Sequence, residues 1–86
     1  MMCKIENLPF KTWELFVQDS CEKCKNLKKA ILNTSIPGKI INASTNKGFL
    51  YAQQKNVFVT PLLILFDEQH NELFRLQSEK ELLNLF

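Results

Sequence analysis

The chain has 86 residues, of which 45% are hydrophobic and 23% are charged, and its formal net charge at pH 7 is +2. A chain of this length forms one small domain, 1–86, and its hydrophobic content excludes an intrinsically disordered tail. The small net charge, with lysines scattered among acids, argues against a nucleic-acid-binding protein.

Three features of the sequence bear on localisation: the first ten residues, the longest apolar run and the number of cysteines. In the lead-in, 1–10, Lys4 and Glu6 interrupt any apolar stretch, so a signal peptide is not expected. The longest apolar run, 62–66, is far too short to cross a bilayer. Three cysteines, two of them close together, indicate metal or redox chemistry in a reducing compartment rather than a secreted disulfide scaffold. We therefore expect a cytoplasmic protein that does not bind membranes.

Turn residues divide the chain into seven elements in the order strand, helix, strand, helix, strand, strand, helix. Runs of β-forming residues predict the strands, and apolar residues three or four positions apart predict the helices. The expected strands are 13–18, 39–42, 62–66 and 73–76. The expected helices are 21–33, 47–55 and 78–86.

One face of each predicted helix carries apolar residues that we expect to pack against the sheet. In chain order these are Cys24, Leu27, Ile31, Leu32, Phe49, Leu50, Ala52, Leu82, Leu83 and Phe86. The second helix has three candidate N-cap residues, Ser44, Thr45 and Asn46. Ser78 and Glu81 form a capping box before the third helix, in which each side chain accepts from the other residue's backbone amide.

The predicted elements assemble into an α/β fold. The run 62–66 has no polar alternation, which suits a central strand covered on both faces. The segment 67–71 is turn-like and joins this strand to the last one as a hairpin. Parallel pairing of the first two strands needs a crossover, which the first helix supplies in the right-handed sense. We therefore expect a four-stranded mixed sheet flanked on both faces by three helices.

The motif Cys21-Glu22-Lys23-Cys24 stands where the first strand gives way to the first helix. The attacking species in disulfide exchange is a thiolate, and the free amides and dipole at a helix start favour negative charge. Cys21 is therefore the expected nucleophile. Cys24 lies one turn further into the helix and is expected to be more buried, which suits a resolving thiol. Two thiols with this spacing can approach within bonding distance.

A second landmark, Thr60-Pro61, stands directly before the third strand. Together with the Cys-x-x-Cys motif and the element order, it resembles the thioredoxin superfamily, and in particular glutaredoxins and glutaredoxin-like small thioredoxins, over 13–86. The resemblance implies a thioredoxin fold in which Cys21 and Cys24 are catalytic. It also implies that Pro61 is a cis-proline and that Thr60 contacts the substrate. Without the resemblance, a trans proline that opens a strand would be favoured.

Two departures from the family narrow the expected function. Leu15-Phe16-Val17 lacks the buried acid that thioredoxin carries in its first strand. Glutathione-using glutaredoxins have a lysine just before the motif and a Gly-Gly followed by acids before the last helix, and this chain has neither. We therefore expect its partners to be a disulfide-containing protein and a reductase or other thiol donor that the sequence does not identify.

These observations predict a thiol–disulfide oxidoreductase, monomeric and without a metal or organic cofactor, that acts in electron transport and cell redox homeostasis. The alternative is a non-enzymatic module that binds a metal, an iron–sulfur cluster or a protein partner through the same cysteines. A structural zinc site requires four ligands. Besides Cys21 and Cys24, only Cys3 and His70 remain as candidates, and they lie far apart in the chain. The plainer interpretations are an incidental thiol for Cys3, a solvated turn residue for His70, and a packing role for Trp13.

Overall fold

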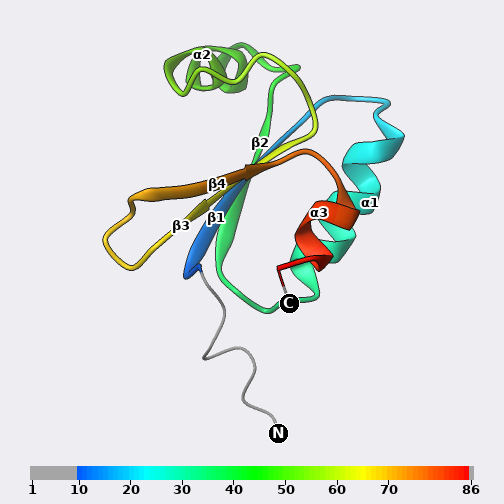
Figure 1. Ribbon diagram of the computed structural model, residues 1–86. Helices are drawn as coiled ribbons and strands as arrows, with labels where there is room; N and C mark the ends of the chain where they lie inside the picture. Colours follow the sequence, from blue (N-terminus) through cyan, green and yellow to red (C-terminus); the bar gives the residue numbers. More distant parts are fainter. Residues whose placement is uncertain (1–9, 86) are drawn as a thin grey trace, which may run out of the picture.

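The computed structural model describes residues 10–85. The elements follow one another in the order β1-α1-β2-α2-β3-β4-α3, as predicted (Figure 1). The strands are β1 (Thr12–Val17), β2 (Gly38–Asn42), β3 (Leu62–Phe66) and β4 (Glu72–Leu76). The helices are α1 (Glu22–Leu32), α2 (Asn46–Gln54) and α3 (Glu79–Leu83).

The strands form one mixed sheet in the order β2-β1-β3-β4. β1 pairs parallel with β2 and antiparallel with β3, and β4 continues the sheet antiparallel to β3. α1 and α3 cover one face, and α2 covers the other (Figure 1). The predicted fold class is confirmed: a four-stranded mixed sheet with three helices on its two faces.

Alternate side chains of the two central strands enter two separate cores. Leu15 and Leu63 pack with α1 and α3, whereas Phe16 and Ile64 pack on the side of α2. All five residues of β3 are buried, as expected of a central strand covered on both faces. β1 and β3 therefore form the fixed centre from which the loops at the ends of the sheet extend.

Of the ten apolar helix residues expected to pack against the sheet, five are buried and four are exposed. The buried ones are Cys24, Leu27, Ile31, Ala52 and Leu82. The prediction is wrong for Leu32, Phe49, Leu50 and Leu83, each of which is more than half exposed. Successive residues of a helix point about 100° apart, so a short helix that touches the sheet along one narrow stripe buries few of its neighbouring apolar residues. Phe86 lies outside the described residues.

Two of the predicted helix caps form, one of them in altered geometry. Thr45 Oγ1 accepts from the N–H of Gly48 at 3.0 Å, and Ser78 Oγ accepts from the N–H of Glu81 at 3.2 Å. The carboxylate of Glu81, however, accepts from the N–H of Gln77 at 2.6 Å, not from that of Ser78. α3 also ends earlier than expected. Within residues 10–85, no helix has the length and apolar character needed to cross a membrane.

Two buried aromatic residues fix the start of β1. Trp13 is buried, and its indole N–H donates to the carbonyl of Ile36 at 2.7 Å. Its ring fills the space where a side chain at Gly38 would lie, so only glycine fits opposite it in the parallel pairing. Phe10, the last residue of the expected lead-in, is buried in the same core, whereas Cys3 lies outside the described residues. The packing role expected of Trp13 is confirmed.

β1 also holds a buried carboxylate that its sequence pattern does not predict. Glu14 is only 1% exposed and faces α2. The hydroxyl of Tyr51 donates to Glu14 Oε2 at 2.6 Å, and Lys39 Nζ lies 3.8 Å from the same oxygen. Glu14 Oε1 has no hydrogen-bond partner among the described residues. Since an unsatisfied buried oxygen is costly, the bond from Tyr51 is important for the stability of this face.

We predict that Tyr51 ionises far above the ordinary range. Its burial, followed by the hydrogen bond to Glu14 and the charge of that group, raises the pKa of Tyr51 from 10.0 to about 12. Because the folded state then holds this proton more tightly than the unfolded state, its contribution to the free energy of unfolding is complete below pH 10 and is lost as the pH rises towards 12.

Tyr51 is the only tyrosine in the chain, so its phenolate absorbance can be followed directly. Glu14→Gln removes the charge and should lower the midpoint of this titration. A wild-type midpoint near 10, or no difference between the two proteins, contradicts the proposed contact.

Candidate active site at the Cys-x-x-Cys motif

The two motif cysteines form a disulfide at the start of α1. Their Cα atoms are 5.2 Å apart, within the ordinary range for a disulfide. Cys21 is the N-cap residue of α1 and has an extended backbone, and Glu22 begins the helix. The motif thus lies at the junction of the first strand and the first helix, as predicted.

The two sulfur atoms have different surroundings. Cys24 is 4% exposed, whereas Cys21 is partly exposed. Cys21 Sγ accepts a hydrogen bond from the N–H of Cys24 at 3.1 Å. When the disulfide is reduced, the same amide and the helix dipole favour the thiolate form of Cys21. The accessible sulfur is therefore also the one that accepts a hydrogen bond from the start of the helix.

The turn that leads to Cys21 is tied to the loop after β2. The N–H of Asp19 donates to Ser44 Oγ at 3.0 Å, and the side-chain amide of Asn42 donates to the carboxylate of Asp19 at 3.1 Å. Ser20 has a left-handed backbone conformation with φ 59°, which reverses the chain between β1 and α1. These contacts fix the position at which Cys21 enters the helix.

Charged side chains near the start of α1 largely offset one another. Glu22 and Lys25 form an ion pair at 3.8 Å, and both side chains are more than two-thirds exposed. Exposed pairs of this kind contribute little energy. Lys23 is also exposed to solvent. The contact that the structure shows directly at the sulfur of Cys21 is therefore the backbone amide of Cys24.

Thr60-Pro61 lies at the same end of the sheet as the cysteines. Because β1 and β3 are antiparallel, with Phe16 opposite Leu62, the residues before β3 lie beside those that follow β1. Thr60 Oγ1 donates to Gln18 Oε1 at 2.6 Å, which joins the two segments directly. The Thr60-Pro61 bond is cis, as predicted; Thr60 is partly exposed and Pro61 is buried. The structure thus brings the Cys-x-x-Cys motif and Thr60-Pro61 to the same end of the sheet.

The segment before Thr60 has two exposed apolar side chains whose exposure the sequence pattern does not predict. Phe58 is 75% exposed and Val59 is 52% exposed. Together with Phe49 of α2 they border a groove of about 170 Å³. By composition the run 57–59 belongs to a core, but only Val57 is buried. The one sequence signal for exposure is the proline two positions after Val59, which marks a loop before the strand.

Within residues 10–85, no cluster of three or more His, Cys, Asp and Glu side chains is arranged to hold a metal ion. His70 is exposed in the turn between β3 and β4, with φ 66°, and its ring stacks on Phe66 with the ring centroids 4.1 Å apart. This placement agrees with the interpretation of His70 as a turn residue. Glu14, the buried acid of β1, faces α2, whereas the cysteines belong to α1 on the opposite face.

We predict that Cys21 is modified before Cys24 in the reduced protein. In a Cys3→Ser background, iodoacetamide should alkylate Cys21 at least about tenfold faster, because Cys21 is accessible and favoured as the thiolate while Cys24 is buried. Peptide mass spectrometry after timed quenching measures both rates. Equal rates, or faster modification of Cys24, contradict the difference between the two sulfur atoms.

Several solved structures are similar to this chain, although neither a protein-family model nor a curated protein sequence matches it. Thioredoxin 1 from the thermophilic eubacterium Thermosipho africanus TCF52B is 28% identical, with a TM-score of 0.69 over 86% of this chain and 88% of that one. A thioredoxin from Thermus thermophilus is 18% identical, with a TM-score of 0.62 over 85% and 68%. The oxidised C-terminal domain of Neisseria meningitidis DsbD is 12% identical, with a TM-score of 0.57 over 87% and 79%.

Proposed function

Because the chain belongs to the thioredoxin superfamily, we propose that it is a thiol–disulfide oxidoreductase that works through Cys21 and Cys24. One observation carries the proposal: a disulfide at a helix start in which one sulfur is partly exposed and bonded by a backbone amide while the other is buried. A disulfide that only staples the fold needs no such asymmetry. Disulfide exchange does need it, since one sulfur must be accessible to the substrate and the other must react only after the mixed disulfide has formed.

The proposed reaction is a two-step exchange. The thiolate of Cys21 attacks one sulfur of the substrate disulfide, so that a mixed disulfide forms and the other substrate sulfur leaves as a thiolate. Cys24 then gives up its proton to solvent and attacks the sulfur of Cys21, which re-forms the Cys21–Cys24 disulfide and releases the second substrate thiolate. Two electrons pass from the protein to the substrate, and a dithiol donor returns them by the reverse exchange.

The amides at the start of α1 assist the exchange with the substrate and the return of electrons from the donor. Before the first step they raise the thiolate fraction of Cys21 at neutral pH. When a dithiol donor returns the electrons, Cys21 is the leaving group of the last exchange, and a stabilised thiolate leaves faster. The bond from the N–H of Cys24 to Cys21 Sγ is the most direct of these contacts.

Thr60 and Pro61 are the proposed substrate-contacting residues. In the family that this chain resembles, the backbone just before the cis-proline pairs with an extended substrate. Two observations support the same role here: Thr60 is partly exposed beside the segment that leads to Cys21, and its hydroxyl bond to Gln18 fixes its orientation.

A polypeptide disulfide is the proposed substrate, and a cytoplasmic dithiol reductase is the proposed electron donor. The exposed side chains of Phe58 and Val59, next to Thr60, offer apolar contact that suits a polypeptide better than a small hydrophilic thiol. A reducing compartment keeps a close thiol pair of this kind available for exchange.

Replacing Cys21 by Ser should abolish catalysed reduction of insulin in the presence of dithiothreitol, because the attacking sulfur is gone. Cys3→Ser is the matched control and should keep the wild-type rate, since Cys3 has no place in the proposed reaction. Activity that survives in Cys21→Ser refutes the catalytic assignment.

Replacing Cys24 by Ser should stop the reaction at the mixed disulfide. Intact-mass analysis after incubation with a disulfide-containing protein should then show a covalent adduct through Cys21 that dithiothreitol releases. Absence of an adduct counts against exchange. Stoichiometric zinc that is lost with either cysteine would favour the alternative, a metal-binding module.

A further inference from the structure

The end of α2 determines where the proposed substrate-contacting segment begins. The N–H of Val57 donates to the carbonyl of Ala52 at 2.8 Å, and the N–H of Asn56 donates to the carbonyl of Gln53 at 3.1 Å. Asn56 has a left-handed backbone with φ 60°. This pair of bonds with a left-handed residue is a Schellman ending, and Val57 adds the accompanying buried apolar contact. The chain therefore leaves α2 in one defined direction.

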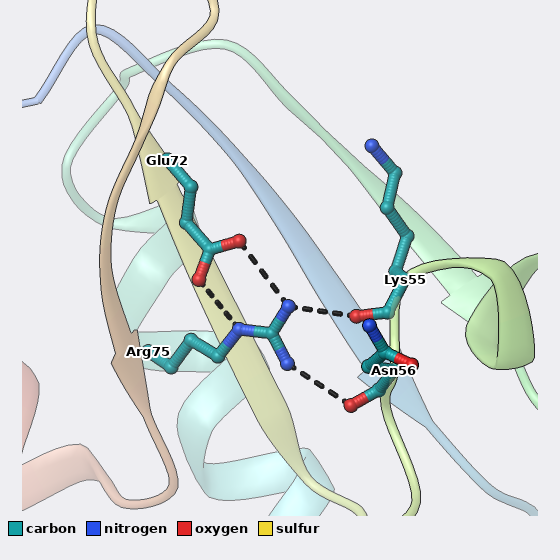
Figure 2. A network of polar contacts seen from close by, with 4 residues as sticks. All are labelled: Lys55, Asn56, Glu72 and Arg75. Carbon is teal, nitrogen blue, oxygen red and sulfur yellow. Dashed lines mark hydrogen bonds and ion pairs between the residues drawn. The ribbon is translucent and has the colours of Figure 1, made fainter.

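Two carbonyls that point out of this helix end are bound by Arg75 of β4 (Figure 2). Arg75 Nη2 donates to the carbonyl of Lys55 at 2.7 Å, and Nη1 donates to that of Asn56 at 3.1 Å. The Nε and Nη2 groups also donate to the carboxylate of Glu72, at 2.5 and 3.2 Å. The planar guanidinium thus makes four bonds at once, and its charge lies at the negative end of the α2 dipole.

A bulge in β4 makes the contact with Glu72 possible. Glu72 and Phe74 pair with consecutive residues of β3, so Leu73 is an extra residue in the ladder. In a regular strand, residues three positions apart point to opposite faces. The extra residue brings Glu72 to the same face as Arg75, where its carboxylate orients the guanidinium towards α2.

The segment after this helix end is held at its other end as well. Thr60 is bonded to Gln18, three residues before Cys21. Between the two attachments Phe58 and Val59 project into solvent beside the cysteines' end of the sheet. Arg75 thus fixes one end of a short span, 57–60, whose other end adjoins the proposed active site.

We propose that Arg75 is a positioning residue for substrate binding: by holding the two carbonyls at the end of α2, it keeps 57–60 in the orientation that receives a polypeptide disulfide. This inference rests on the function proposed above. Arg75 pairs with Ile64 on the face of α2, whereas Cys21 and Cys24 belong to α1 on the opposite face. Its effect is therefore on substrate affinity and not on the chemistry of the thiols.

The test compares Arg75→Gln, Arg75→Lys and, as a matched control, Lys28→Gln, which removes an exposed positive charge from α1. Each variant is assayed with insulin and with a small disulfide, bis(2-hydroxyethyl) disulfide, with dithiothreitol as donor. Arg75→Gln should raise the KM for insulin about fivefold and leave kcat within about twofold, the size expected for lost hydrogen bonds that act through a loop.

The small disulfide should react at the wild-type rate in every variant, because it does not span 57–60. Arg75→Lys should show an intermediate KM, since an ammonium keeps the charge but not the planar fork. Lys28→Gln should match the wild type. Amide hydrogen exchange at Val57 should be faster in Arg75→Gln than in the control, as expected of a loosened helix end.

An unchanged KM for insulin in a folded Arg75→Gln protein overturns the proposal. A parallel fall in kcat and in the rate with the small disulfide also overturns it, since that result locates the damage at the thiols. If Arg75→Gln does not fold, Arg75→Lys decides by the same criteria. Failure of the proposed function gives a different result from failure of this inference. If the proposed function is wrong, Cys21→Ser retains the insulin-reducing activity, whether or not Arg75 is replaced.

Discussion

The hydrogen bond from the amide of Cys24 to the sulfur of Cys21 is the interaction on which the proposed chemistry depends. It exists because Cys21 caps α1, where the first amides have no carbonyl partner within the helix. To the disulfide this amide is a weak donor, but to a thiolate it is a charge-assisted one at the positive end of the helix dipole. The same local geometry leaves one sulfur accessible and buries the other, which suits the two steps of the proposed exchange reaction.

The rest of the fold brings a second segment to the end of the sheet from which the chain leads to that sulfur. The antiparallel pairing of β1 with β3 places Thr60 beside the end of β1, and the bond between Thr60 and Gln18 joins the two directly. Contacts among the loops after β1 and β2 fix the turn before Cys21, and Arg75 fixes the end of α2. The apolar centre of the sheet brings the loop after β1 and the loop before β3 near each other. The polar contacts at the end of the sheet then fix how the two loops are aligned.

Local patterns in the sequence predict the element order and the place of the motif, because each depends on residues close together in the chain. The cis form of the Thr60-Pro61 bond follows only from the family resemblance, since local pattern alone favours a trans bond. Contacts between distant residues lie beyond such patterns. Glu14 alternates with Trp13 and Leu15, a pattern typical of a solvent-facing strand residue, yet α2 covers that face and Tyr51 supplies a hydroxyl. The fork of Arg75 depends on a β-bulge and on a helix end about twenty residues away, neither of which has a local sequence signal.

The most direct test of the central claim is the ultraviolet absorbance of thiolates in the reduced protein, titrated against pH in a Cys3→Ser background. A thiolate signal should already be present at neutral pH, should persist in Cys24→Ser and should vanish in Cys21→Ser. If the signal instead develops only above about pH 9 and is the same in both variants, the helix does not favour the anion at Cys21 and the account is contradicted.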